Sequence, residues 1–169
     1  FEVARNDGPW QLAADVKKTN VLAKYTGPLA NFDTSLVFSH YDNDWNSTDQ
    51  VPRRLVDSGA IDRFGFIDPT LGGRSTRTSL IASINDERLE AGVWLSQYAL
   101  NLFGNFTYFL EDQANGDQHE QVDRRWIGGG HAAMTFPVGE RVSLRIGGDL
   151  RNDAIDADLH LSTGRVRRT

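Results

Sequence analysis

Apolar and polar residues alternate with a period of two along much of the chain. Between residues 142 and 150, every second position is apolar or glycine, and the positions between them are polar or glycine. Successive side chains of a β-strand point to opposite faces, so this pattern predicts a strand with one apolar and one polar face. The same pattern predicts strands over residues 32–40, 74–84, 89–99 and 124–136, and less regular alternation predicts two more over 17–26 and 155–165. The residues expected on the apolar face are Phe32, Leu36, Phe38, Leu80, Ala82, Ile84, Leu89, Ala91, Val93, Leu95, Ala99, Trp126, Ala132, Met134, Phe136, Val142, Leu144, Ile146, Gly148 and Leu150.

The connections between the predicted strands alternate in length. Residues 27–30, 86–88 and 137–141 form short turns that contain Gly, Pro or Asp. Residues 42–73 and 101–122 form long loops, well beyond the about 12–15 residues that are usual in a compact domain. Within the first long loop, residues 51–58 are expected to form a short helix that ends at Gly59. Asp68-Pro69 and Gly72-Gly73 are expected to form a turn that leads the chain back into the next strand.

The apolar positions change parity in the C-terminal part of the chain, between Leu150 and Ile155. Two structures fit this change: a hairpin at residues 152–154, or one long strand over residues 142–167 that contains a bulge. We favour the long strand.

These elements predict an all-β fold, an antiparallel meander. Alternation alone fits a soluble sheet with one buried face as well as a membrane barrel with one face toward lipid. The alternating loop lengths favour part of a transmembrane β-barrel with long extracellular loops. Aromatic residues expected near strand ends favour it too, because such rings prefer the headgroup region; they are Phe32, Tyr41, Trp94, Trp126 and Phe136.

Composition narrows the class further. No stretch approaches the roughly 18 consecutive apolar residues of a membrane-spanning helix, so a helical membrane protein is excluded. The net charge of −5 and the scattered Lys and Arg residues argue against nucleic acid as a partner. With no cysteine, neither a disulfide scaffold nor a thiolate metal site is expected.

Two segments resemble a known family. Residues 45–80 read WNSTDQVPRRLVDSGAIDRFGFIDPTLGGRSTRTSL, and residues 101–125 read NLFGNFTYFLEDQANGDQHEQVDRR. Both are similar to external loops and flanking strands of proteobacterial TonB-dependent receptors, and with the hairpins around them the resemblance extends from about Gly8 to Arg151.

The resemblance implies a location in the outer membrane of a Gram-negative bacterium and a barrel of roughly 22 strands with an internal plug. It implies TonB-dependent uptake of a ligand such as a siderophore or another scarce nutrient. The implied partners are outer-membrane lipid, the imported ligand, the receptor's own plug and the inner-membrane TonB system. Residues 1–169 contain about seven predicted strands and neither plug nor TonB box, so we expect them to be a segment of one barrel domain. The alternative is a soluble β-rich domain that binds a ligand or carbohydrate.

No motif predicts an enzyme, a metal site or a cofactor. Residues 42–46 have the oxygen-rich spacing of a calcium loop, but Ser47 and Arg53 replace its Gly and Glu. His119, Glu120 and Asp123 lack a further nearby His, and no Ser lies in a nucleophile-elbow pattern. Gly128–Gly130 falls within a strand, where glycines permit bending or a close approach of a neighbour.

The external loops supply the candidate ligand contacts, because aromatic rings and fixed positive charge suit an anionic iron chelate or another polar ligand. The candidates are Trp45, Arg53, Arg54, Phe106, Tyr108 and Phe109. In the alternative interpretation, Phe103, Phe106, Tyr108 and Phe109 form the loop's own small core. The sequence leaves the ligand open among heme, siderophores, vitamins and oligosaccharides.

Overall fold

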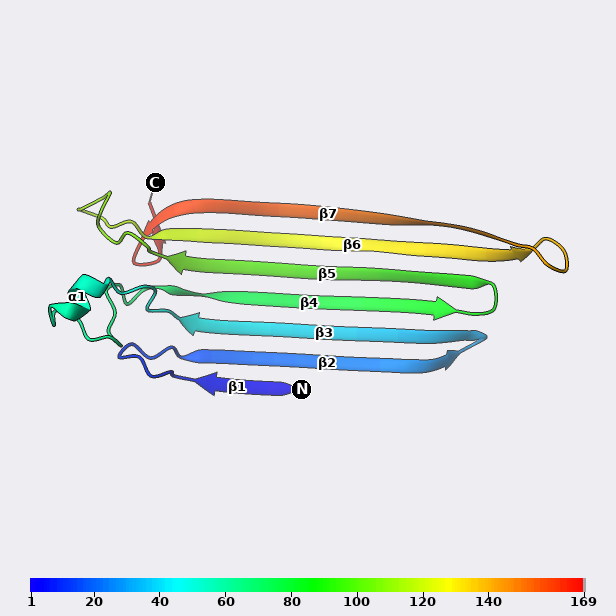
Figure 1. The fold of residues 1–169 in the computed structure, drawn as a ribbon, viewed down its shortest axis with the longest axis horizontal. Coiled ribbons are helices and arrows are strands. Elements are labelled where there is room, and N and C mark those ends of the chain that lie inside the picture. Colours follow the sequence, from blue (N-terminus) through cyan, green and yellow to red (C-terminus); the bar gives the residue numbers. More distant parts are fainter. Residues whose placement is uncertain (169) are drawn as a thin grey trace.

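A computed structural model describes residues 1–168 of the chain; Thr169, which belongs to the predicted segment 1–169, lies outside them. The chain forms one antiparallel sheet in which each strand pairs with the next in sequence (Figure 1). The elements are β1 (Glu2–Asn6), β2 (Val16–Leu29), β3 (Phe32–Asn46), α1 (Arg53–Asp57), β4 (Gly72–Asn85), β5 (Leu89–Gly104), β6 (His119–Pro137), β7 (Ser143–Thr163) and β8 (Val166–Arg167). The predicted all-β antiparallel meander is confirmed. No helix within residues 1–168 has the length and hydropathy needed to cross a bilayer.

The strands extend further into the predicted long loops than the sequence indicated. β3 continues to Asn46 and β6 begins at His119, so the long connections are residues 47–71 and 105–118. These extensions are mostly polar on both faces and carry no alternation, but the ladder is unbroken there, as in the pairing of Trp45 with Gly73. β1 also lacks alternation and was not predicted; it forms by pairing with the start of β2.

Most of the predicted long C-terminal strand is confirmed, since β7 covers residues 143–163 of the predicted 142–167. β7 pairs with β6 from Ser143–Pro137 to Leu161–His119 in one continuous register, so neither the hairpin at 152–154 nor a bulge is present. A turn at residues 164–165 then leads into β8. The apolar residues therefore change from one face to the other: Leu150 and Ile155 lie on opposite sides of the same continuous strand.

The two kinds of connection lie at opposite ends of the sheet (Figure 1). Residues 30–31, 86–88 and 138–142 make the turns at one end, called here the turn end. Residues 7–15, 47–71 and 105–118 lie at the other, the loop end, together with α1. The first turn is tighter than predicted because Leu29 pairs with Phe32, which leaves Ala30 and Asn31 to reverse the chain.

The pairing places nearly all predicted apolar residues on one face. Directly paired residues of antiparallel strands share a face. One such row crosses the sheet through Tyr25, Leu36, Ala82, Val93, Gly130 and Leu150. We call this side the apolar face. The opposite side, the polar face, carries Lys24, Ser35, Ser83, Glu90, His131 and Arg145.

The apolar face is not covered. Leu80, Val93 and Leu150 are 52%, 61% and 74% exposed, and residues 1–168 provide no second layer. The buried apolar residues are Leu71, Tyr108 and Val122, all toward the loop end. Two predicted strand-end aromatics, Tyr41 and Trp94, instead lie inside β3 and β5 on the polar face. Both strands begin where predicted, at Phe32 and Leu89, but extend beyond their predicted ends.

Candidate functional site

Three segments that are far apart in sequence meet at the loop end. They are residues 47–71, residues 105–118 and the turn that follows β7, and we call them together the loop cap. The most deeply buried side chains among the described residues lie in the loop cap or at the end of β7 that meets it: Leu71 and Ser162 are 0% exposed, and Asn105 and Gln118 are 2% exposed. The loop cap therefore has a packed interior, whereas the sheet does not.

Gln118 joins the three segments. Its Nε2 donates to Asp68 Oδ2 at 2.9 Å and to Thr70 Oγ1 at 2.7 Å. Its Oε1 accepts from Ser162 Oγ at 3.0 Å and from the backbone N–H of Arg165 at 2.8 Å. All four hydrogen-bonding positions of this buried amide are thus used.

Arg165 makes a second connection across the loop cap. Its guanidinium donates to the carbonyl oxygens of Thr70 and Leu71 at 2.7 and 3.0 Å and to Asn46 Oδ1 at 3.2 Å. It also lies 5.5 Å from the centre of the Phe103 ring. One side chain thereby fixes the turn after β7 to the ends of β3 and β5.

Loop 105–118 is organised by two carboxylates. Asp117 accepts the backbone N–H groups of Leu110, Glu111 and Asp112 at 2.8–3.1 Å. Burial raises the pKa of Asp117, but these N–H donors together outweigh it and the net shift is downward. The side-chain amide and backbone N–H of Asn115 lower the pKa of Asp112 to about 2.

The three predicted aromatic contacts of this loop are in different environments. Tyr108 is buried; its N–H donates to Asn105 Oδ1 at 2.7 Å and its hydroxyl to the Gln50 carbonyl. Burial raises the pKa of the Tyr108 hydroxyl. Phe106 and Phe109 are 65% and 53% exposed. Of the aromatics suggested for a loop core, Tyr108 alone is buried.

The other predicted contacts lie elsewhere at the loop end. Trp45 is half-buried on the polar face of β3. Arg53 and Arg54 are exposed on α1, where Arg53 pairs with Asp57 at 3.3 Å. The structure does not bring these three residues together with Phe109 around one cavity.

A cavity of about 200 Å³ opens inside the loop cap. It lies between residues 67–70, loop 105–118 and the end of β7, and Phe109 is the one predicted contact that lines it. Asn105, Gln118 and Thr163, which also line it, were missed. Their sequence neighbours give no signal, because the residues that face them come from other segments.

No match is found when the chain is compared with protein-family models, with curated proteins and with solved structures.

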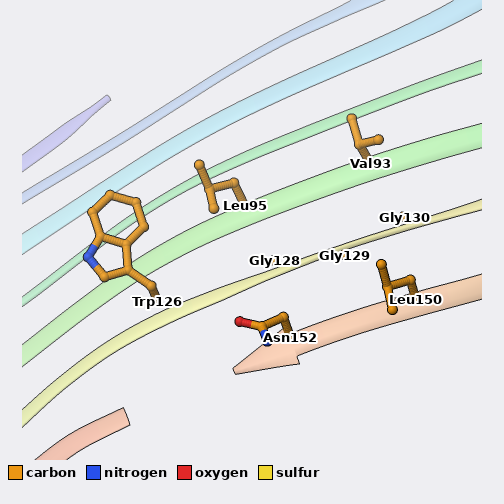
Figure 2. A pocket seen from close by; sticks show the side chains of 8 residues that line it. All are labelled: Val93, Leu95, Trp126, Gly128, Gly129, Gly130, Leu150 and Asn152. Atoms are coloured by element: carbon orange, nitrogen blue, oxygen red, sulfur yellow. The ribbon is translucent and has the colours of Figure 1, made fainter. Parts of the chain in front are cut away.

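A second hollow, of about 440 Å³, lies on the apolar face (Figure 2). Val93 and Leu95 border it on β5, Leu150 on β7, and the glycines of β6 form its floor. Gly129 points to the polar face, where the Trp94 ring lies against it; an added Cβ would be 2.3 Å from Trp94 Cζ2. The predicted role of these glycines, close approach of a neighbour, is confirmed at Gly129.

The residues considered for a metal site are separated by strand geometry. Asp42 and Asp44 lie in β3 and not in a loop, and Asp42 pairs with Arg74 at 2.7 Å. His119 and Glu120 are successive residues of β6 and point to opposite faces. Within residues 1–168 no group of three or more His, Cys, Asp or Glu side chains is placed to hold a metal ion.

Proposed function

We propose that this chain is a segment of the barrel wall of a TonB-dependent receptor in a bacterial outer membrane, and that the receptor imports a ligand such as a siderophore or another scarce nutrient. The similarity of residues 45–80 and 101–125 to that family supports the proposal. The observation that carries it is the uncovered apolar face, which lies opposite a polar face in a single-layered sheet.

The dimensions of the apolar face match a bilayer. On β6 an aromatic residue stands at each end of the apolar run, Trp126 toward the loop end and Phe136 at the turn end. The ten residue steps between them span about 33 Å at about 3.3 Å per residue. At the about 40° tilt of a barrel strand this becomes about 25 Å, the height of the apolar band of outer-membrane barrels.

The charged pairs lie outside the apolar band or on the polar face, as expected for a barrel wall. Beyond Trp126, toward the loop end, the apolar face gives way to the pairs Arg74–Asp42 and Arg124–Asp156. On the polar face, Glu90 contacts Arg145 at 2.5 Å at the level of the apolar band. In a receptor this face would line the lumen, beside the plug.

The proposal requires that the open edge of β7 be paired in the complete receptor. Beyond Ser143–Leu161 of β7, residues 1–168 provide no further strand, since β8 pairs only with Ser162 and Thr163. Unpaired backbone groups are costly in lipid, and closure with the remaining strands of a barrel satisfies them.

Tryptophan quenching tests the proposal. The chain has Trp10, Trp45, Trp94 and Trp126. Two variants, each retaining only Trp94 or only Trp126 with the others changed to Phe, are refolded into phosphatidylcholine vesicles whose acyl chains carry bromine. We expect stronger quenching of Trp126, on the apolar face, than of Trp94. Equal quenching, or a chain that stays monomeric in detergent-free buffer and unfolds cooperatively, would refute the proposal in favour of the soluble alternative.

A further inference from the structure

The cavity in the loop cap contains no free charge. Among its lining residues Asp68 alone carries a charged side chain, and both of its oxygens are used. Asp68 Oδ1 accepts from the Thr70 N–H and hydroxyl at 2.8 and 2.5 Å, and Oδ2 accepts from Gln118 at 2.9 Å. No Lys or Arg lines the cavity. An anionic chelate would therefore find no cation there, and a neutral ligand fits better.

Asn105 offers the cavity an unused donor. The residue is 98% buried, and its Oδ1 accepts from the Tyr108 N–H at 2.7 Å. Its Nδ2 donates to no atom of residues 1–168, and it is not one of the fully enclosed unpaired atoms there, which are Asn43 Oδ1, Asn101 Oδ1 and Arg168 Nε. The Nδ2 is therefore accessible from the cavity and can donate to an acceptor that enters it.

The remaining lining is a flat apolar surface beside a hydroxyl. Phe109 lies against Gly116, which adopts φ 80°, and a Cβ there would be 3.2 Å from Phe109 Cε1. Ile67 and Pro69 add apolar surface, and the Thr163 hydroxyl donates to the Asn115 carbonyl at 2.9 Å, which leaves its lone pairs free to accept.

We propose that this cavity binds one hexose ring of a neutral saccharide. The C–H face of the ring stacks on Phe109, one ring oxygen accepts from Asn105 Nδ2, and a ring hydroxyl donates to Thr163. The about 200 Å³ volume is below the about 300–1,000 Å³ typical of drug-sized ligands, which limits the subsite to a single ring. The inference rests on the proposed receptor function and names its ligand class.

The test is saturation-transfer NMR on the full chain, refolded in a detergent without a sugar headgroup. The probes are the methyl glycosides of glucose, galactose and mannose, with glucuronate as the charged control. We expect saturable binding of at least one neutral glycoside and none of glucuronate. Absence of saturable neutral binding, or tighter binding of glucuronate, overturns the proposal.

Matched variants locate the site. Phe109→Ala is expected to weaken binding about tenfold or more, while Phe106→Ala, which removes the loop's other exposed Phe ring, next to His119, leaves it unchanged. Asn105→Asp retains the acceptor for the Tyr108 N–H but loses the donor, and is also expected to weaken binding. If Phe109→Ala and Phe106→Ala weaken saccharide binding equally, the cavity is not the binding site. This comparison holds even if Asn105→Asp perturbs the loop.

The two proposals fail separately. If bromine quenches Trp126 more strongly than Trp94 but the chain binds no hexose, only the proposed saccharide site is refuted. If the chain binds the hexose through Phe109 but Trp126 is not quenched, the proposed receptor function is refuted. The site then belongs to a soluble carbohydrate-binding domain.

Discussion

Two adjacent glycines of β6, Gly128 and Gly129, differ in the space available for a side chain. A Cβ on Gly129 would lie 2.3 Å from Trp94 Cζ2 and 2.5 Å from the Leu150 carbonyl oxygen. A Cβ on Gly128 would meet the flexible end of Leu95 at 3.3 Å and the Trp94 carbonyl oxygen at 3.6 Å, which is an ordinary van der Waals distance. We therefore expect Gly129→Ala to destabilise the folded chain by about 1–3 kcal/mol, through overpacking, and Gly128→Ala to change it little. Urea unfolding of the two variants in detergent measures the difference, and equal stabilities would contradict the packing described.

The low pKa of Asp112 predicts how loop 105–118 responds to acid. Its folded pKa of about 2 lies below the ordinary 3.8, so its bonds stabilise the loop above about pH 3.8 and are lost as the pH falls through about 2. Because Asn115 is the main cause, Asn115→Ala should raise the pKa of Asp112 toward 3.8. A carbon NMR titration of the Asp112 carboxyl measures this shift. Gln113→Ala, an exposed change in the same loop, is the control, and an unchanged pKa in Asn115→Ala would refute the assignment.

Single residues show how far the candidate site could be predicted. Phe109 was identified because an aromatic residue in a polar loop stands out locally. Asn105 and Gln118 were not, because an amide in a loop carries no signal until its surroundings are known. The partners of Gln118 lie 44 and 50 residues away, at Ser162 and Asp68.

Among the elements, Gln118 is the link between the two long loops and the turn after β7. Gln118→Ala would leave the buried Ser162 hydroxyl without this acceptor, at about 1–3 kcal/mol, and would remove one of the bonds of the partly buried Asp68 carboxylate. We expect faster hydrogen exchange at residues 68–71 and 162–165, with the centre of the sheet unchanged. Gln121→Ala, an exposed change three residues further on in β6, is the control, and similar exchange in both variants would mean that Gln118 does not hold the loops.

Alternation located the strands but not their ends. It is readable where one face is apolar, as from Leu144 to Leu150, and it vanishes where both faces are polar, as from Asp42 to Asn46. Pairing with both neighbours maintains the strand there, and single-strand patterns do not contain that information. The turn at residues 86–88 was predicted correctly because its determinant is local: Asp86 Oδ1 accepts the N–H groups of Arg88 and Leu89.

At the scale of the whole molecule, the two faces of the sheet should tolerate charge differently. Ala132 lies near the middle of the apolar run of β6, and Ala133 lies on the polar face opposite Glu90. Ala132→Arg is expected to cost about 2–4 kcal/mol of folding free energy in vesicles, the usual cost of Arg toward lipid near the midplane. Ala133→Arg, which faces Glu90, should cost far less. Urea titration in vesicles compares the two, and equal costs would contradict a lipid-facing apolar side.

The long-range bonds of the loop cap also imply an order of assembly. The sheet can grow by adding each hairpin to the previous one, since every strand pairs with its neighbour in sequence. Gln118 and Arg165 cannot complete their bonds until the end of β7 arrives, and contacts between distant residues form late because loop closure costs entropy. The sheet therefore forms first, and the long loops of the loop cap gain their fixed shape only when the last long strand is in place.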